Sequence, residues 1–122
     1  MPFEVHADRE RNRLHITLTG FASLDDVARF EEDLRRALEC LPADLGPHQL
    51  LYDVSAAQIQ SQEVVEALRR LALLSPRTSA FALVNASALA GRQLRRIFLG
   101  ADVHLCRDRN EAIRWLDFRR TG

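Results

Sequence analysis

Hydrophobic side chains occupy every second position in two short segments near the start of the chain. Residues 3–8 alternate in this way, and residues 14–19 repeat the pattern. A period of two is typical of a β-strand with one buried face, so we expect two strands here. The charged residues 9–12 between them indicate a hairpin loop. If the hairpin turns symmetrically, His6 lies opposite His15.

After Gly20 the spacing of the apolar residues changes to three and four, which is the period of an amphipathic helix. Ser23 is a typical N-cap residue, and two aspartates follow it where the helix dipole favours negative charge. The first helix is therefore expected between Ser23 and Pro42. Three further helices are predicted on the same criteria, over about 61–75, over 87–100 and from 108 onwards.

Three other segments are almost continuously apolar, at 49–55, 79–85 and 103–106. Such runs are typical of strands that are covered on both faces. Asp108 and Glu111 have the spacing of a capping box and mark the start of the last helix. The predicted element order is ββαβαβαβα. We expect one α/β domain over residues 1–122, in which an antiparallel N-terminal hairpin and parallel strands form a mixed sheet with helices packed on it.

The 122 residues include 17 basic and 17 acidic side chains, and the resulting net charge of zero argues against general binding to nucleic acids. No apolar stretch is long enough to span a bilayer and no secretion signal opens the chain, so we expect a cytoplasmic protein. Peripheral contact with a membrane stays open. Residues 1–61 hold six arginines and 11 acidic residues, and residues 62–122 hold the reverse, which is compatible with homodimerisation.

Three segments carry a family resemblance: the N-terminal hairpin, LYDVS at 51–55, and DRNEAIRWL at 108–116. Together with the element order, they resemble the STAS domain of bacterial anti-sigma-factor antagonists. Within that fold the chain is similar to the SpoIIAA-like group, which has been compared with the lipid-binding CRAL-TRIO domain. The resemblance implies a small bacterial binding or signalling module. In antagonist STAS domains a partner kinase phosphorylates a serine in an Asp-Ser-Ser-Gly-like sequence after this strand. The corresponding candidate is Ser61, in the altered context Ser-Gln-Glu.

Polar side chains gather at the carboxyl ends of the predicted parallel strands, which is the edge where an open α/β sheet usually binds its ligands. The candidate ligand-binding residues there are Asp53, Ser55, Asn85 and Ser87. Three arginines share one side of the predicted third helix and suit a phosphate or carboxylate group; they are Arg92, Arg95 and Arg96. The alternative is that the serines cap helices and the arginines form salt bridges. The ligand hypothesis is a small amphipathic or anionic molecule.

Motifs for catalysis or for a cofactor do not occur in the sequence: no glycine-rich phosphate loop, GxSxG, HExxH or CxxC is found. Cys40 and Cys106 are therefore interpreted as reduced structural thiols, and neither a catalytic residue, a cofactor nor a metal site is expected. His6 and His15 would need a third ligand, and a solvent-facing polar pair is the alternative. The sequence favours a non-enzymatic module that binds a small ligand. The second hypothesis is interaction with a regulatory protein near Ser61.

Overall fold

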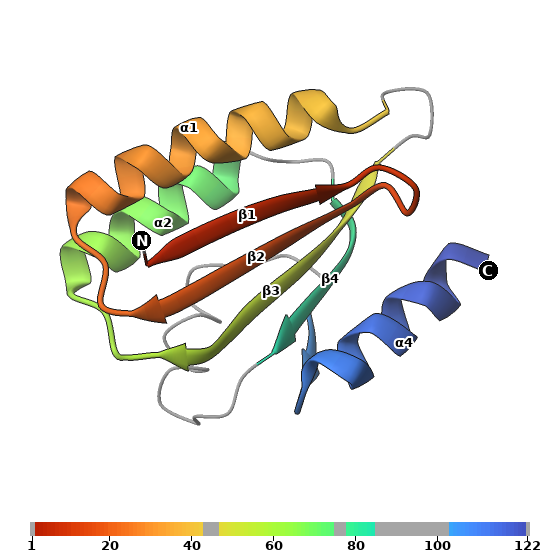
Figure 1. The fold of residues 1–122 in the computed structure, drawn as a ribbon. Helices are drawn as coiled ribbons and strands as arrows, with labels where there is room; N and C mark the ends of the chain where they lie inside the picture. Colours follow the sequence, from red (N-terminus) through yellow and green to blue (C-terminus); the bar gives the residue numbers. More distant parts are fainter. Residues whose placement is uncertain (1, 43–46, 75–77, 85–102, 122) are drawn as a thin grey trace.

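The computed structural model describes residues 2–42, 47–74, 78–84 and 103–121 (Figure 1). Five strands form one sheet in the order β1-β2-β3-β4-β5. Their bounds are β1 (Phe3–Asp8), β2 (Arg13–Gly20), β3 (His48–Ala57), β4 (Thr78–Val84) and β5 (Val103–Cys106). The first pair is antiparallel and the other three pairs are parallel, which confirms the predicted mixed sheet.

The hairpin of β1 and β2 has the symmetric register that the sequence predicts. His6 pairs with His15, and the two imidazole rings lie 6.1 Å apart at their centres. At the tip, Asn12 adopts the left-handed conformation with a φ of 51°, which asparagine tolerates better than most residues. The carbonyl of Asn12 accepts a 2.9 Å hydrogen bond from the amide of Gln49, so the turn is joined to the start of β3.

Three helices are described, namely α1 (Leu24–Cys40), α2 (Gln62–Leu74) and α4 (Arg109–Thr121). Ser23 caps α1 as predicted, in a reciprocal pair of hydrogen bonds with Asp26. The start of α4 departs in detail from the predicted capping box. The carboxylate of Asp108 accepts from the amide of Glu111, but Glu111 accepts from the amide of Arg107, one residue before the expected donor.

The third helix that the sequence predicts, at 87–100, lies outside the described residues. No described helix is both long enough and apolar enough to cross a bilayer. Strand β3 extends two residues beyond its predicted end, because Ala56 and Ala57 still pair with the end of β2.

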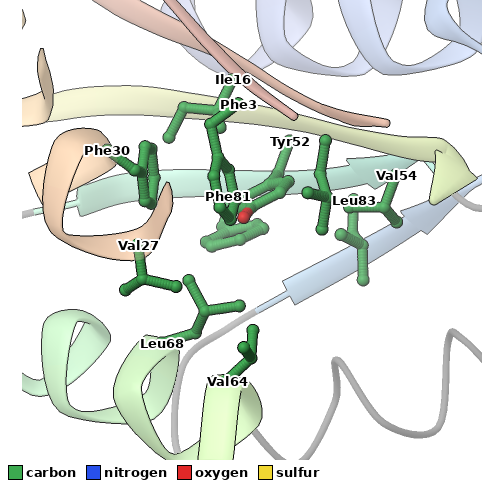
Figure 2. Close-up of a cluster of buried hydrophobic side chains, with 11 residues drawn as sticks. Phe3, Ile16, Val27, Phe30, Tyr52, Val54, Val64, Leu68, Phe81 and Leu83 are labelled. Atoms are coloured by element: carbon green, nitrogen blue, oxygen red, sulfur yellow. The ribbon is translucent and has the colours of Figure 1, made fainter. Parts of the chain in front are cut away.

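The larger hydrophobic core lies between the sheet and the helices α1 and α2 (Figure 2). Val27 and Phe30 from α1 and Val64 and Leu68 from α2 meet side chains from the strands. Phe30 stacks on Phe3 of β1 with ring centres 4.3 Å apart. The stripe of apolar residues that predicted α1 therefore marks the face that packs on the sheet.

A second and smaller core covers the opposite face of the sheet under α4. Ala112 and Leu116 of α4 pack there against Leu51 and Ala82. Because successive strand residues point to opposite faces, Leu51 belongs to this core while Tyr52 belongs to the larger one. Strand β3 is thus covered on both sides, as its continuous apolar pattern predicts.

Candidate functional site

A buried arginine joins the hairpin to α4. Arg13 is only 1% exposed, and its Nε donates a 3.0 Å hydrogen bond to the side-chain oxygen of Gln49. Its Nη2 lies 2.7 Å from Asp117 of α4, and Gln49 donates to the carbonyl of Leu116. Arg13 thus links the hairpin to β3 through Gln49 and to α4 through Asp117.

A second polar group lies on the same face, nearer the carboxyl ends of the strands. Asp53 accepts hydrogen bonds from the amide and the hydroxyl of Ser55, at 3.1 and 2.6 Å. Nη1 of Arg109, the first residue of α4, lies 3.2 Å from the other carboxylate oxygen of Asp53. Burial alone would raise the pKa of Asp53, but the hydrogen bonds from Ser55 and the charge of Arg109 hold it below its ordinary value. Asp53 is thus a fixed anion that balances Arg109.

His15 completes this group from the neighbouring strand. Its Nδ1 lies 3.4 Å from Nη2 of Arg109, and since a guanidinium only donates hydrogen bonds, Nδ1 is the acceptor. Partial burial, together with the charges of Arg109 and Arg13, lowers the pKa of His15 to about 4. His15 is therefore neutral near pH 7 and carries its proton on Nε2.

The candidate phosphorylation residue, Ser61, stands at the beginning of α2. It is exposed, and its Oγ accepts a 3.2 Å hydrogen bond from the amide of Val64. This is the geometry of an N-cap. The structure therefore places the hydroxyl of Ser61 at a helix start and in contact with solvent.

The loop that leads to Ser61 is tied to the loop between β2 and α1. Gln60 is buried, and its side-chain amide donates to the carbonyls of Gly20 and Gln58 while its oxygen accepts from the amide of Ala22. Figure 1 shows the two loops side by side where β2 and β3 end. Hydrogen bonds of Gln60 therefore join the two loops at this edge of the sheet.

Three large apolar side chains are exposed around this edge. Phe21 is 64% exposed, Ile59 52% and Leu24 49%. Phe21 lies between Gly20 and Ala22 in the sequence, and Ile59 lies between Gln58 and Gln60. We call Phe21, Leu24 and Ile59 the apolar edge. A groove of about 690 Å³ is lined by Leu24 and by side chains of α2, among them Arg69 and Arg70.

A third group of functional side chains lies where β5 turns into α4. His104, Cys106 and Glu111 each offer a ligand atom, and these atoms lie within 4.8 Å of one another. Cys106 is buried, and burial followed by the charges of Glu111 and Asp108 raises the pKa of its thiol to about 11. No CxxC motif marks this group in the sequence, but His104 and Cys106 have the i, i+2 spacing that puts two strand residues on one face.

Of the candidate ligand-binding residues, the structure brings Asp53 and Ser55 together, and they bind each other. The other five candidates fall outside the described residues: Asn85, Ser87, Arg92, Arg95 and Arg96. Sequence reasoning missed Arg109, which contacts Asp53 across 56 positions of the chain and His15 across 94. Among the cysteines, Cys106 is buried as expected of a structural thiol, whereas Cys40 is exposed.

Comparison of the sequence with models of protein families and with curated proteins finds no match. Comparison with solved structures does find a similar fold. An uncharacterised protein of the DUF3478 family from Shewanella loihica PV-4, described as having a SpoIIAA-like fold, superimposes with a TM-score of 0.71. The alignment covers 93% of this chain and 91% of the other at 18% sequence identity. The fold that the hairpin, the 51–55 strand and the last helix resemble is confirmed: this chain has a SpoIIAA-like fold.

Proposed function

We propose that the protein is a non-enzymatic interaction module that binds a regulatory protein through the apolar edge. The observation that carries this proposal is the exposure of Phe21 and Ile59 on two loops that Gln60 joins, together with that of Leu24 at the start of α1. Large apolar side chains gathered on a rigid surface are typical of contact sites for other proteins. A fixed edge also loses little conformational entropy on binding.

The charges around the apolar edge indicate what kind of surface a partner protein would present. Asp25 and Asp26 follow Leu24 in the first turn of α1, and Glu63 lies in the first turn of α2. The exposed apolar residues are therefore bordered by acidic side chains. The complementary surface is an apolar pocket with arginine or lysine at its rim, since such pairing steers association and rejects acidic surfaces.

Ser61 is positioned to regulate this contact. Its hydroxyl is accessible, and a phosphoryl group at an N-cap is favoured by the helix dipole. The same group would place about two negative charges beside Ile59, in a surface that must lose its water when the partner binds. Phosphorylation of Ser61 would therefore weaken binding of the partner, and the resemblance to antagonist STAS domains implies that a kinase would add the phosphoryl group.

The experiment is a cross-linked pull-down from the host organism, followed by affinity measurement with the purified partner. The test variant is Phe21→Ser with Ile59→Ser, and the matched control is Phe118→Ser, which removes an aromatic residue 76% exposed on α4. Direct binding that is lost in the test variant, kept in the control and weakened by Ser61→Asp supports the proposal. Equal binding by the test variant and the control, or recovery of no protein, contradicts it.

The groove along α2 favours a second candidate function, the binding of a small amphipathic ligand. Its lining combines apolar side chains with both signs of charge, two carboxylates and two guanidinium groups. The lining residues are Leu24, Gln62, Glu63, Val65, Glu66, Ala67, Arg69 and Arg70. Its volume of about 690 Å³ falls within the usual range for small-molecule sites, about 300–1,000 Å³. An apolar chain would lie along the helix, with an anionic head group at the arginines.

Native mass spectrometry distinguishes this candidate from the first. A ligand in the groove adds mass to the 13.9 kDa chain, and the added mass disappears on denaturation. It should also disappear in Arg69→Ser with Arg70→Ser but persist in Arg35→Ser, which removes an exposed arginine from α1. A spectrum that shows only the bare chain counts against the ligand and leaves the protein-binding proposal standing.

A further inference from the structure

The turn between β5 and α4 brings together three side chains of the types that bind transition metals. His104 and Cys106 are two residues apart on β5, so both point to the face of the sheet that α4 covers. Glu111 lies in the first turn of α4, and its carboxylate is close to the end of the same strand. The ligand atoms of the three side chains lie within 4.8 Å of one another.

We propose that His104, Cys106 and Glu111 bind a single zinc ion. A thiolate, an imidazole and a carboxylate are the donors that Zn²⁺ takes in proteins, at bond lengths of about 2.0–2.3 Å. Tetrahedral coordination at those lengths separates donor atoms by roughly 3.3–3.8 Å. Shifts that shorten the distances between donor atoms by at most about 1–1.5 Å therefore close the site. Three protein ligands leave a fourth position, which water occupies.

The contacts of each side chain are compatible with this role. The ring of His104 stacks on Trp115 at 4.4 Å, which fixes the ring plane while its nitrogens remain on the ring edge. One carboxylate oxygen of Glu111 accepts from the amide of Arg107, which orients the group and leaves the second oxygen as a ligand. Such outer contacts are typical of metal sites, because they hold ligands in place before the ion arrives.

Cys106 gives the site its selectivity. A thiolate favours zinc and copper over magnesium and calcium, which prefer oxygen ligands. On coordination the thiol transfers its proton to the buffer, so the bound sulfur is a thiolate. Cys106 is 3% exposed, whereas the other cysteine, Cys40, is exposed at the end of α1. Cys40 is therefore an internal control for metal binding at a surface thiol.

The experiment uses the full chain, stripped of metal with a chelator and kept reduced. Co²⁺ serves as the spectroscopic probe, and Zn²⁺ is then added in competition. We expect one Co²⁺ per chain, with sulfur-to-cobalt charge-transfer absorption and the intense visible bands of a four-coordinate ion, and displacement by one Zn²⁺. Added Zn²⁺ should also raise the melting temperature.

The variants remove one ligand each while keeping its packing. They are Cys106→Ala, His104→Phe, which retains a ring against Trp115, and Glu111→Gln, which can still accept from Arg107. Each should weaken Zn²⁺ binding at least about tenfold, because even the loss of an outer contact costs about 10–100-fold. Circular dichroism checks that each variant is folded.

Cys40→Ser should leave the stoichiometry, the spectrum and the affinity unchanged. The proposal is overturned if the folded wild-type protein takes up no metal, or if Cys106→Ala binds as tightly as wild type. It is also overturned if Cys40→Ser abolishes binding, because the ion would then be held by the exposed thiol.

Discussion

Replacing Arg13 is expected to destabilise the protein far more than replacing the neighbouring Arg11, although both arginines face carboxylates. Arg13 is 1% exposed and bonds to Gln49 and Asp117, whereas the side chain of Arg11 is 45% exposed and pairs with Asp8 at the surface. In Arg13→Ala the buried oxygen of Gln49 loses its donor, which costs about 1–3 kcal/mol.

The loss of the ion pair adds to this cost. Removing one partner of a buried pair costs about 3–5 kcal/mol, but Asp117 is 46% exposed and can be hydrated again. We therefore expect Arg13→Ala to lower the free energy of unfolding by about 3 kcal/mol in all, which is the lower end of the range for a buried pair. For a chain of 122 residues that corresponds to a fall in melting temperature of about 12 °C. Arg11→Ala should cost less than about 1 kcal/mol.

Urea denaturation followed by circular dichroism measures both free energies of unfolding. Arg13→Met retains the buried apolar stem and isolates the polar contribution, so it should recover only part of the loss. If Arg13→Ala and Arg13→Met each cost less than about 1 kcal/mol, the buried network does not hold α4 to the sheet and the reasoning fails.

Three further measurements test individual residues. The pKa of His15 is about 4 in the folded state against 6.5 in the unfolded chain. Between pH 6.5 and pH 4 the imidazole is therefore protonated in the unfolded chain but not in the folded protein. The free energy of unfolding should therefore fall as the pH drops from 6.5 to 4, and His15→Gln should reduce that slope in urea titrations. Ser61→Ala removes the acceptor of the Val64 amide and should cost about 1 kcal/mol in the same assay, whereas Ser61→Asp should not. In metal-free protein an alkylating reagent should modify the exposed Cys40 quickly and Cys106 only on unfolding, since Cys106 is buried with its pKa raised to about 11; equal rates would contradict the packing of β5.

Local patterns in the sequence were sufficient to predict the strands, the described helices and the hairpin register. The alternation in residues 3–8 and 14–19 determines which side chains share a face, so the pairing of His6 with His15 follows from arithmetic along the chain. The apolar stripe of α1 and its Ser23 cap are equally local. These features depend on neighbours within about four positions.

The polar contacts under α4 depend on segments that are distant in the sequence. Asp117 is 104 positions from Arg13, and nothing in the residues beside either one indicates that they meet. Asp53 was identified as a candidate for ligand binding, but its partner Arg109 lies 56 positions away. From the sequence alone, Asp53 is recognisable as a polar residue near the end of a strand. Only the tertiary fold shows that the hydrogen-bonding groups of Asp53 and Arg109 are used within the protein.

Gln60 shows how one buried amide links the fold to the proposed function. Its side chain donates to the carbonyls of Gly20, the last residue of β2, and of Gln58, and it accepts from the amide of Ala22. These backbone groups are therefore hydrogen-bonded within the protein. Phe21 and Ile59, which alternate with the bonded residues, are turned outward as a consequence. The proposed contact site therefore includes backbone that is already hydrogen-bonded within the protein, which would lower the entropy lost on binding a partner.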